Sequence, residues 1–175
     1  MEYTFTLKYQ LAADDRDPNA LVERLAQADC DDALVGIGQP GRLALEFTRD
    51  AGSAEAALRS ALEDVRRAVP SARLIEAAPD FVGLTDVAEV MGVSRQYMRK
   101  LMLTHSGGSF PPPVHEGSAA IWHLTDVLAW LRANVNYAPD GTVMDVARVA
   151  MQVNVAKEGR RLTHAADREL ATLVG

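Results

Sequence analysis

The chain has 175 residues, a formal net charge of −6 and a pI near 5.2, and 48% of its residues are hydrophobic while 24% are charged. This balance is typical of a globular protein and excludes a disordered chain. No apolar run approaches the roughly 18–20 residues that span a bilayer, and the first residues have no signal-peptide pattern. A single cysteine, Cys30, cannot form an internal disulfide. We therefore expect a cytoplasmic protein with no membrane partner.

The first 80 residues alternate between strand and helix patterns. β-Branched and aromatic residues at strand spacing predict strands, and apolar residues three and four apart predict helices. In chain order, the expected elements are a strand at 3–11, a helix at 19–28, strands at 32–38 and 42–50, a helix at 54–69 and a strand at 72–78. Gln39-Pro40-Gly41 suits a hairpin turn, and Ser53 is a natural N-cap. This order predicts a ferredoxin-like βαββαβ domain over residues 1–78 of an α+β chain.

The rest of the chain divides at loops rich in Pro, Gly and Asn. Residues 78–80, Ala-Pro-Asp, are interpreted as a hinge, and a second loop covers residues 134–141. Between these loops, residues 81–133 combine short helical patterns with a Gly- and Pro-rich interruption. A C-terminal helical extension is expected over residues 141–175, with helices at 142–157 and 163–173.

The negative charge is confined to the first of these parts. Residues 1–80 hold 9 Lys or Arg against 15 Asp or Glu, whereas residues 81–133 hold 4 of each kind and residues 134–175 hold 5 of each. No carboxylate occurs from Val90 to His115. The overall acidity of the chain therefore does not describe the electrostatic field around this segment.

Residues 84–102 have the spacing of a helix-turn-helix. Ala88 occupies the position where the two helices would touch, and Gly92, four residues later, can take a positive φ at the turn. Thr85 and Ser94 are natural N-caps for the two helices. Apolar residues fall where the helices would bury a shared core: Val87, Met91, Val93, Met98 and Leu101.

The second of these helices has two contrasting faces when it is drawn at 100° per residue. The inward face carries Ser94, Met98, Leu101 and Met102. The outward face carries Gln96, Arg99, Lys100 and Leu103, with Arg95 and Tyr97 on the flanks. Gln can pair with adenine, Arg or Lys with guanine, and flanking groups can hold phosphates. A solvated amphipathic helix would also explain the basic residues, but not the turn spacing, the caps and the missing acids together. The pattern therefore predicts a reader of double-stranded DNA.

The stretch "FVGLTDVAEVMGVSRQYMRKLM", followed by "FPPPVHEGSAAIWHLTDVLAWLR", resembles the winged helix-turn-helix of the MerR superfamily, and especially its small AlpA-like regulators and excisionases. The run Phe110–Pro113, the hairpin "EGSAAIW" to Trp122 and the triplet 129–131 match in order. The resemblance covers residues 81–133. It implies sequence-selective DNA binding, usually as a dimer, with residues 95–100 in the major groove and the wing on the backbone or minor groove.

The wing departs from the family pattern. Wings of this family usually offer Arg or Lys, whereas this one offers His115, Ser118 and the carboxylate of Glu116. Its affinity for phosphate is expected to be weak, or to come from backbone N–H groups near Gly117 and Ser118. Both tryptophans, Trp122 and Trp130, are expected in the core. The resemblance says nothing of the first domain.

Other chemistry finds little support in the sequence. The four histidines, at 105, 115, 123 and 164, lack metal-ligand spacing. Cys30 lies between two acids, which disfavour its thiolate. We therefore expect no metal, no cofactor and no enzymatic activity.

The sequence thus predicts a transcriptional regulator that reads a two-fold symmetric operator as a homodimer. Its first domain would dimerise, sense a small ligand or recruit a protein partner. One alternative is a protein-interaction or ligand-binding adaptor whose winged unit does not bind DNA, and another is an excisionase-like architectural factor. The dimer seam is expected at a sheet edge or face, or at a C-terminal stripe that could equally pack on its own chain: Val143, Val146, Ala150 and Val153.

Overall fold

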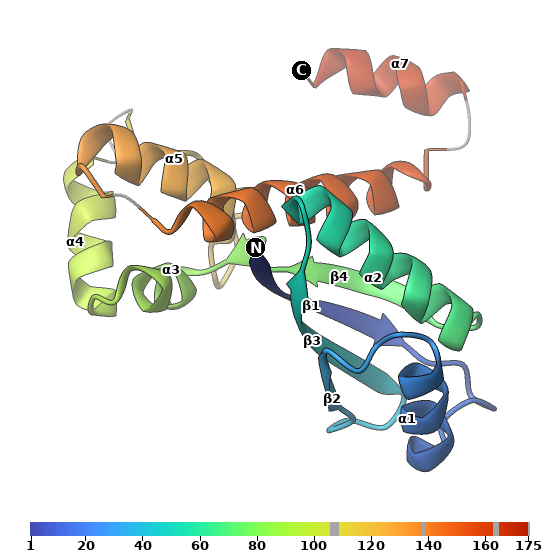
Figure 1. Ribbon diagram of the computed structural model, residues 1–175. Helices are drawn as coiled ribbons and strands as arrows, with labels where there is room; N and C mark the ends of the chain where they lie inside the picture. Colours follow the sequence, from blue (N-terminus) through green and yellow to red (C-terminus); the bar gives the residue numbers. More distant parts are fainter. Residues whose placement is uncertain (106–108, 138, 163–164, 175) are drawn as a thin grey trace.

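The computed structural model describes residues 1–105, 109–137, 139–162 and 165–174. The chain is mixed α/β, with a four-stranded antiparallel sheet and a two-stranded one (Figure 1). Its elements are β1 Glu2–Gln10, α1 Pro18–Gln27, β2 Ala33–Gly36, β3 Arg42–Asp50, α2 Ala54–Ala68, β4 Arg73–Ala78, β5 Phe81–Val82, α3 Leu84–Met91, α4 Arg95–His105, β6 Trp122–His123, α5 Leu124–Asn134, α6 Gly141–Gly159 and α7 Ala165–Leu173. All six elements expected in residues 1–80 are present in the expected order.

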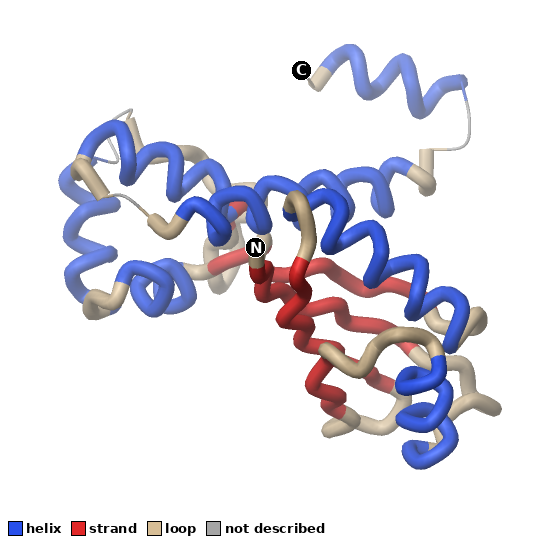
Figure 2. Tube along the Cα trace, in the orientation of Figure 1, coloured by secondary structure: helices blue, strands red, loops and turns tan. Residues whose placement is uncertain are grey.

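The four-stranded sheet has the strand order β2-β3-β1-β4, with every neighbouring pair antiparallel (Figure 2). Because side chains alternate along a strand, β1 and β3 each have one buried face. The buried side chains of these strands pack against α1 and α2: Tyr3, Phe5, Leu7, Tyr9, Leu43, Leu45 and Phe47. The rings of Phe5 and Phe47, which are cross-strand partners, stack with centroids 5.3 Å apart. We call residues 1–78 the sheet lobe.

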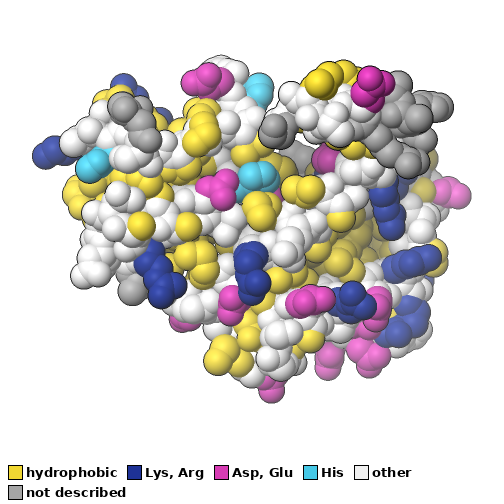
Figure 3. All heavy atoms as spheres, turned by 90° about the horizontal axis from the view of Figure 1, so that it is seen from above, with side chains coloured by type: hydrophobic (Ala, Val, Ile, Leu, Met, Phe, Trp, Pro, Cys, Tyr) yellow, Lys and Arg dark blue, Asp and Glu magenta, His cyan; other side chains and the backbone are white. Residues whose placement is uncertain are grey.

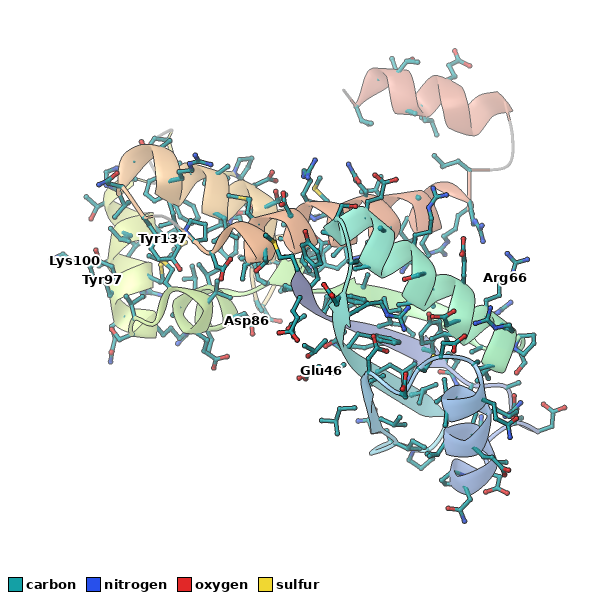
Figure 4. All side chains as sticks on the ribbon, viewed as in Figure 1. Glu46, Arg66, Asp86, Tyr97, Lys100 and Tyr137 are labelled. Carbon is teal, nitrogen blue, oxygen red and sulfur yellow. The ribbon has the colours of Figure 1, made fainter. Side chains whose placement is uncertain are left out.

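The opposite face of this sheet has no helix over it in the described chain, and we call it the open face (Figure 1). Its side chains are exposed or half-buried and come from four strands: Thr4, Thr6, Lys8 and Gln10 of β1, Leu34 and Gly36 of β2, Arg42, Ala44, Glu46 and Thr48 of β3, and Arg73 and Glu76 of β4. Figure 4 shows Glu46 pointing away from α2. The face is therefore polar at most positions.

Local sequence signals explain the turns and helix ends of the sheet lobe. Arg42 N–H donates to the carbonyl of Gln39 at 3.0 Å, and Gly41 has φ of 77°. Pro40 followed by a glycine of positive φ is the arrangement of a type II turn, so the predicted hairpin turn is confirmed. The Ser53 hydroxyl accepts the N–H of Ala56 at 3.1 Å, which confirms the predicted N-cap of α2.

A buried ion-pair network joins β3 to α2. The Arg49 guanidinium is 8% exposed and donates to Asp32 and to Asp64, in each case at a shortest distance of 2.7 Å. These two carboxylates, Asp32 most strongly, hold the pKa of Arg49 above its ordinary range. Nearby, burial raises the pKa of the Cys30 thiol to about 11, so this thiol is a neutral core group. A charged residue in the core at position 49 was not predicted from the sequence.

Residues 81–137, which we call the helical unit, build a second core from β5, α3, α4, β6 and α5. Its buried side chains include Val82, Val87, Met98, Leu124, Leu128 and Leu131. Trp122 and Trp130 are 4% and 7% exposed, so the expectation that both belong to the core is confirmed. Strand pairing of Phe81 with His123 and of Val82 with Trp122 forms the two-stranded sheet, which the sequence did not predict.

Helix α6 connects the two cores (Figure 1). Val146, Val149 and Ala150 are buried in the core of the sheet lobe, whereas Ala147 is buried in the core of the helical unit. The sequence left open whether the C-terminal stripe forms a dimer seam or packs on its own chain. In the structure, the stripe packs on its own chain. In Figure 1, α7 lies apart from both cores, and no helix among the described residues is long and apolar enough to cross a membrane.

Buried hydrogen bonds fix the segment 78–80 that was interpreted as a hinge. The Asn154 amide of α6 bonds both the N–H and the carbonyl of Ala77 at 2.8 Å, which closes the outer edge of β4. Its Nδ2 also lies 2.7 Å from Asp80 Oδ2. Asp80 is fully buried, and its Oδ1 lies 2.7 Å from Nδ1 of His123. The segment therefore joins β4 to β6 and α6, because the buried carboxylate of Asp80 contacts His123 of β6 and Asn154 of α6.

Candidate nucleic-acid interface

The turn between α3 and α4 has the geometry that its spacing predicts. Gly92 takes φ of 66° and ψ of 32°, the left-handed conformation that ends α3. Val93 N–H donates to the carbonyl of Ala88 at 2.9 Å, and Ala88 is 2% exposed. A small buried residue and a left-handed glycine therefore bring α4 across α3, as expected for residues 88 and 92.

The two helix caps differ from one another. The Ser94 hydroxyl accepts the N–H of Tyr97 at 3.2 Å, so the predicted cap of α4 is confirmed. The prediction that Thr85 caps α3 is wrong, because α3 begins one residue earlier and Gly83 is its N-cap. Gly83 N–H donates to Asp86 Oδ2 at 2.7 Å, which is the half of a capping box that the third helical residue supplies. Thr85 is an exposed residue of the first turn.

Helix α4 presents its predicted polar face to solvent. Met98 is fully buried, whereas these predicted DNA-binding residues are exposed: Arg95, Gln96, Tyr97, Arg99 and Lys100. Figure 4 shows Tyr97 and Lys100 projecting away from the rest of the molecule. Among the described residues, no Asp or Glu lies within 4 Å of the charged nitrogens of Arg95, Arg99 or Lys100. These cations are therefore available to a partner.

The predicted wing is smaller than expected. Its strand pairing is one isolated bridge between His115 and Ile121, in which Val114 N–H also donates to the Ile121 carbonyl at 2.7 Å. The bridge ends at Ile121, directly before Trp122, and Trp122 itself pairs with Val82 of β5. Its indole N–H donates to the Pro111 carbonyl at 3.0 Å, so the proline run is tied to the core.

An open groove of about 920 Å³ separates α4 from this loop. Four of the predicted site residues line it: Thr85, Arg95, Arg99 and Ser118. Three others, Gln96, Tyr97 and Lys100, lie on α4 outside the groove lining, and the Ser94 hydroxyl serves in the cap. The His115 ring covers Gly117, where an added β-carbon would lie 2.6 Å from Nε2. The structure therefore divides the predicted site into a groove and an outer face of α4.

Two carboxylates in the groove offset its two arginines. Asp86 and Glu116 line the same groove as Arg95 and Arg99. Sequence reasoning noted Glu116 as a departure of the wing but did not place Asp86 or the wall formed by residues 111–113. Asp86 lies three residues after Gly83, the N-cap of α3, and this spacing is the sequence signal that could have placed its carboxylate near the start of α3. The groove is formally neutral, and Lys100 is the one Lys or Arg of α4 that lies outside its lining.

Charged side chains are distributed unevenly on the surface that is seen from above. Figure 3 shows Lys and Arg side chains at the left end, where Figure 1 places α4 and α5, whereas the right-hand part mixes Lys and Arg with Asp and Glu. Within the described residues, no group of three or more His, Cys, Asp or Glu side chains could hold a metal ion.

No protein-family model, no curated protein and no solved structure matches the chain.

Proposed function

We propose that this protein is a cytoplasmic, sequence-specific DNA-binding transcriptional regulator that acts as a homodimer. The observation that carries the proposal is the exposed, unpaired basic face of α4, placed after a left-handed glycine turn and a short preceding helix. A helix held in this way can enter the major groove, where Arg and Lys pair with guanine and Gln pairs with adenine. Arg95, Gln96, Arg99 and Lys100 would then contact DNA.

The architecture that we propose is a ferredoxin-like sandwich followed by a winged helix-turn-helix of the MerR kind. The strand order β2-β3-β1-β4 and the βαββαβ order of the sheet lobe support the first part. The α3-Gly92-α4 turn, the bridged loop at residues 114–122 and the closing helix α5 support the second part. Ser118 of the short loop and Arg99 of α4 line the same groove, where both could flank one DNA strand.

A dimer follows from the size of this interface. A single module of this kind contacts little DNA surface, and two copies related by a two-fold axis read two half-sites of a symmetric operator. Phosphate contacts would come from Arg95 at the start of α4 and from backbone N–H groups of the loop. The partner in this proposal is double-stranded DNA.

The test is a binding titration with random-sequence duplex DNA at about 50 and about 200 mM salt, followed by sequencing of the bound fraction. We expect enrichment of a two-fold symmetric motif and an affinity that falls as salt rises, because phosphate contacts release counterions. No enrichment and no salt-dependent binding would overturn the proposal.

Arg99 provides the residue-level test. Arg99→Ala should weaken binding to the enriched site by about 1–3 kcal/mol if its guanidinium reads a base. Arg132→Ala is the matched control, because Arg132 is an exposed arginine of the neighbouring helix α5. Equal losses on all sequences would assign Arg99 to a phosphate. An unchanged affinity would contradict its placement at the interface.

A second candidate function is an adaptor that binds a protein or a ligand through the helical unit. The neutral groove favours this reading, since Asp86 and Glu116 would repel a DNA backbone. The same titration separates the two candidates, because an adaptor would show no salt-dependent binding to any duplex. An excisionase-like factor would bind and bend its site, which a DNA-bending assay would detect.

A further inference from the structure

The open face of the sheet has an uneven charge distribution. Cross-strand partners lie on the same face, so the strand register sorts its side chains into rows. One row holds Arg42, Gln10 and Arg73, and the next holds Ala44, Lys8 and Glu76, with Gly36 beside Ala44. The third row holds Leu34, Glu46 and Thr6. Positive charge therefore lies at the hairpin end of the face, and Glu46 lies toward its middle (Figure 4).

A hollow and an exposed leucine lie side by side on this face. Gly36 and Ala44 line a depression of about 400 Å³, together with Lys8, Gly38, Gln39 and Arg42. Leu34, two residues before Gly36 on the same face of β2, is 73% exposed. An added β-carbon at Gly36 would meet only Ala44, at 3.7 and 3.8 Å, so the hollow exists because residue 36 lacks a side chain. The exposed apolar side chain of Leu34 thus lies one row away from a hollow that Gly36 and Ala44 line.

We propose that a second copy of this chain covers the open face, through a two-fold axis that runs across the strands between the row of Thr6 and the row of Lys8. Such an axis places each strand over the same strand of the partner subunit, and the two strands then run in opposite directions. Leu34 of one protomer then enters the hollow over Gly36 of its partner, and the partner's Leu34 enters the hollow of the first. This reciprocity is what an isologous interface requires.

The same axis matches the charges. Glu46 of one protomer comes to lie over Ala44 of the partner subunit, in the row that carries the partner's Lys8 and one row away from the partner's Arg42. Lys8 is already paired with Glu76 at 3.1 Å, whereas Arg42 forms no ion pair among the described residues. A parallel arrangement of the two sheets would instead keep each row over the same row of the partner, so that Glu46 would lie over the row of the partner's Glu46, which association disfavours. The charge pattern therefore selects the antiparallel pairing.

The alternative seams are less favourable. Helix α6 is packed into both cores, and Asn154 closes the outer edge of β4. The other sheet edge, β2, is only four residues long, which limits edge-to-edge pairing. This inference deepens the proposed function, because it names the surface that would join two DNA-binding units, and it can be tested without DNA.

The first experiment is sedimentation velocity of the full-length protein over a concentration series, without DNA. We expect a reversible dimer, and a monomer at every concentration would overturn the inference. Leu34→Lys places a charge in each of the two symmetric hollows and should raise the dimer dissociation constant about a hundredfold or more, because each leucine loses its burial. Gly36→Val fills the hollow and should also weaken the dimer. Circular dichroism shows whether each variant keeps its fold.

A charge exchange tests the predicted orientation. Glu46→Arg and Arg42→Glu should each raise the dissociation constant by about tenfold or more, since each places like charges together at two symmetric positions. The double variant should recover most of the lost affinity, because opposite charges again face each other. A double variant that is weaker than both single variants would overturn the antiparallel pairing.

Leu173→Lys is the matched control for Leu34→Lys, since Leu173 is a 76% exposed leucine of α7. We expect it to leave the dimer unchanged. A dimer that Leu173→Lys disrupts and Leu34→Lys does not would assign the interface to α7 and overturn the inference. A protein that dimerises as expected but binds no DNA would retain this interface and contradict the proposed function alone.

Discussion

Three arginines of the sheet lobe and two of the helical unit have opposite surroundings. Arg24, Arg49 and Arg67 each form an ion pair with an aspartate of their own lobe. Arg95 and Arg99 of α4 form none among the described residues, although Asp86 and Glu116 line the same groove. Engaged cations stabilise the chain that carries them, whereas unengaged cations keep their hydrogen-bonding capacity for another molecule. Arg24, Arg49 and Arg67 thus stabilise the fold, whereas Arg95 and Arg99 are available for binding.

The largest effect is expected at the buried network. Arg49→Ala should lower the free energy of unfolding by about 3 kcal/mol or more, because Asp32 would be left without its cation and Asp64 would keep only Arg67. Urea denaturation followed by circular dichroism measures this loss. Arg59→Ala is the control, since Arg59 is exposed and only 3.9 Å from Glu55. Equal losses for the two variants would show that the network adds nothing specific.

The junction between the two regions comes next. Asn154→Ala removes three hydrogen bonds to Ala77 and Asp80, and we expect it to cost about 2–3 kcal/mol, because buried polar groups would lose their partners. Differential scanning calorimetry of the full chain measures the effect. Gln152→Ala, at an exposed position of the same helix, should leave the unfolding temperature almost unchanged. A similar temperature for both variants would contradict the role assigned to Asn154.

The turn of the helical unit should be less sensitive. Gly92→Ala places a β-carbon at φ of 66° and should cost about 1–2 kcal/mol through backbone strain alone. Gly38→Ala is a matched control in the sheet lobe, because neither glycine has an atom within 4 Å of the added β-carbon, and Gly38 does not have a positive φ in the range that strains side chains. Thermal denaturation of both variants tests the difference. Comparable stability of the two would contradict the strained conformation.

The smallest expected effect concerns the groove. Glu116→Gln removes one of its two carboxylates, and DNA affinity should rise about twofold to fivefold, as for other exposed charge interactions. Fluorescence anisotropy with the enriched duplex measures the change. Glu89→Gln on the exposed side of α3 is the control, since Glu89 does not line the groove. An unchanged affinity for Glu116→Gln would show that this carboxylate does not face the DNA.

Local signals predicted most of the elements and the turns between them. The type II turn at Gly41, the Ser53 and Ser94 caps and the left-handed Gly92 all depend on residues within four positions in sequence. Such interactions can be inferred from a single sequence, because the chain itself fixes which groups meet. The predicted exposed face of α4 has the same origin, since helical periodicity determines which side chains point outward.

Interactions between distant positions were not predicted. Asn154 meets Ala77 across 77 residues, and β5 pairs with β6 across the whole of α3 and α4. No periodicity relates such residues, and an aspartate such as Asp80 carries no sequence signal that distinguishes a buried junction from an exposed hinge. The misplaced cap at Thr85 has a related cause, because β5 fixes where α3 begins and thereby gives the role to Gly83.

The packing of α6 has a consequence for the reach of the molecule. Because one continuous helix is buried in both cores, the orientation of α4 relative to the sheet depends on the length and phase of α6. In a dimer that forms through the two sheets, α6 would determine the distance between the two α4 helices. Inserting one residue into α6 would shift one core by about 1.5 Å and rotate it by about 100° relative to the other. The spacing of the two half-sites that such a protein reads would then be encoded in a helix that touches no DNA.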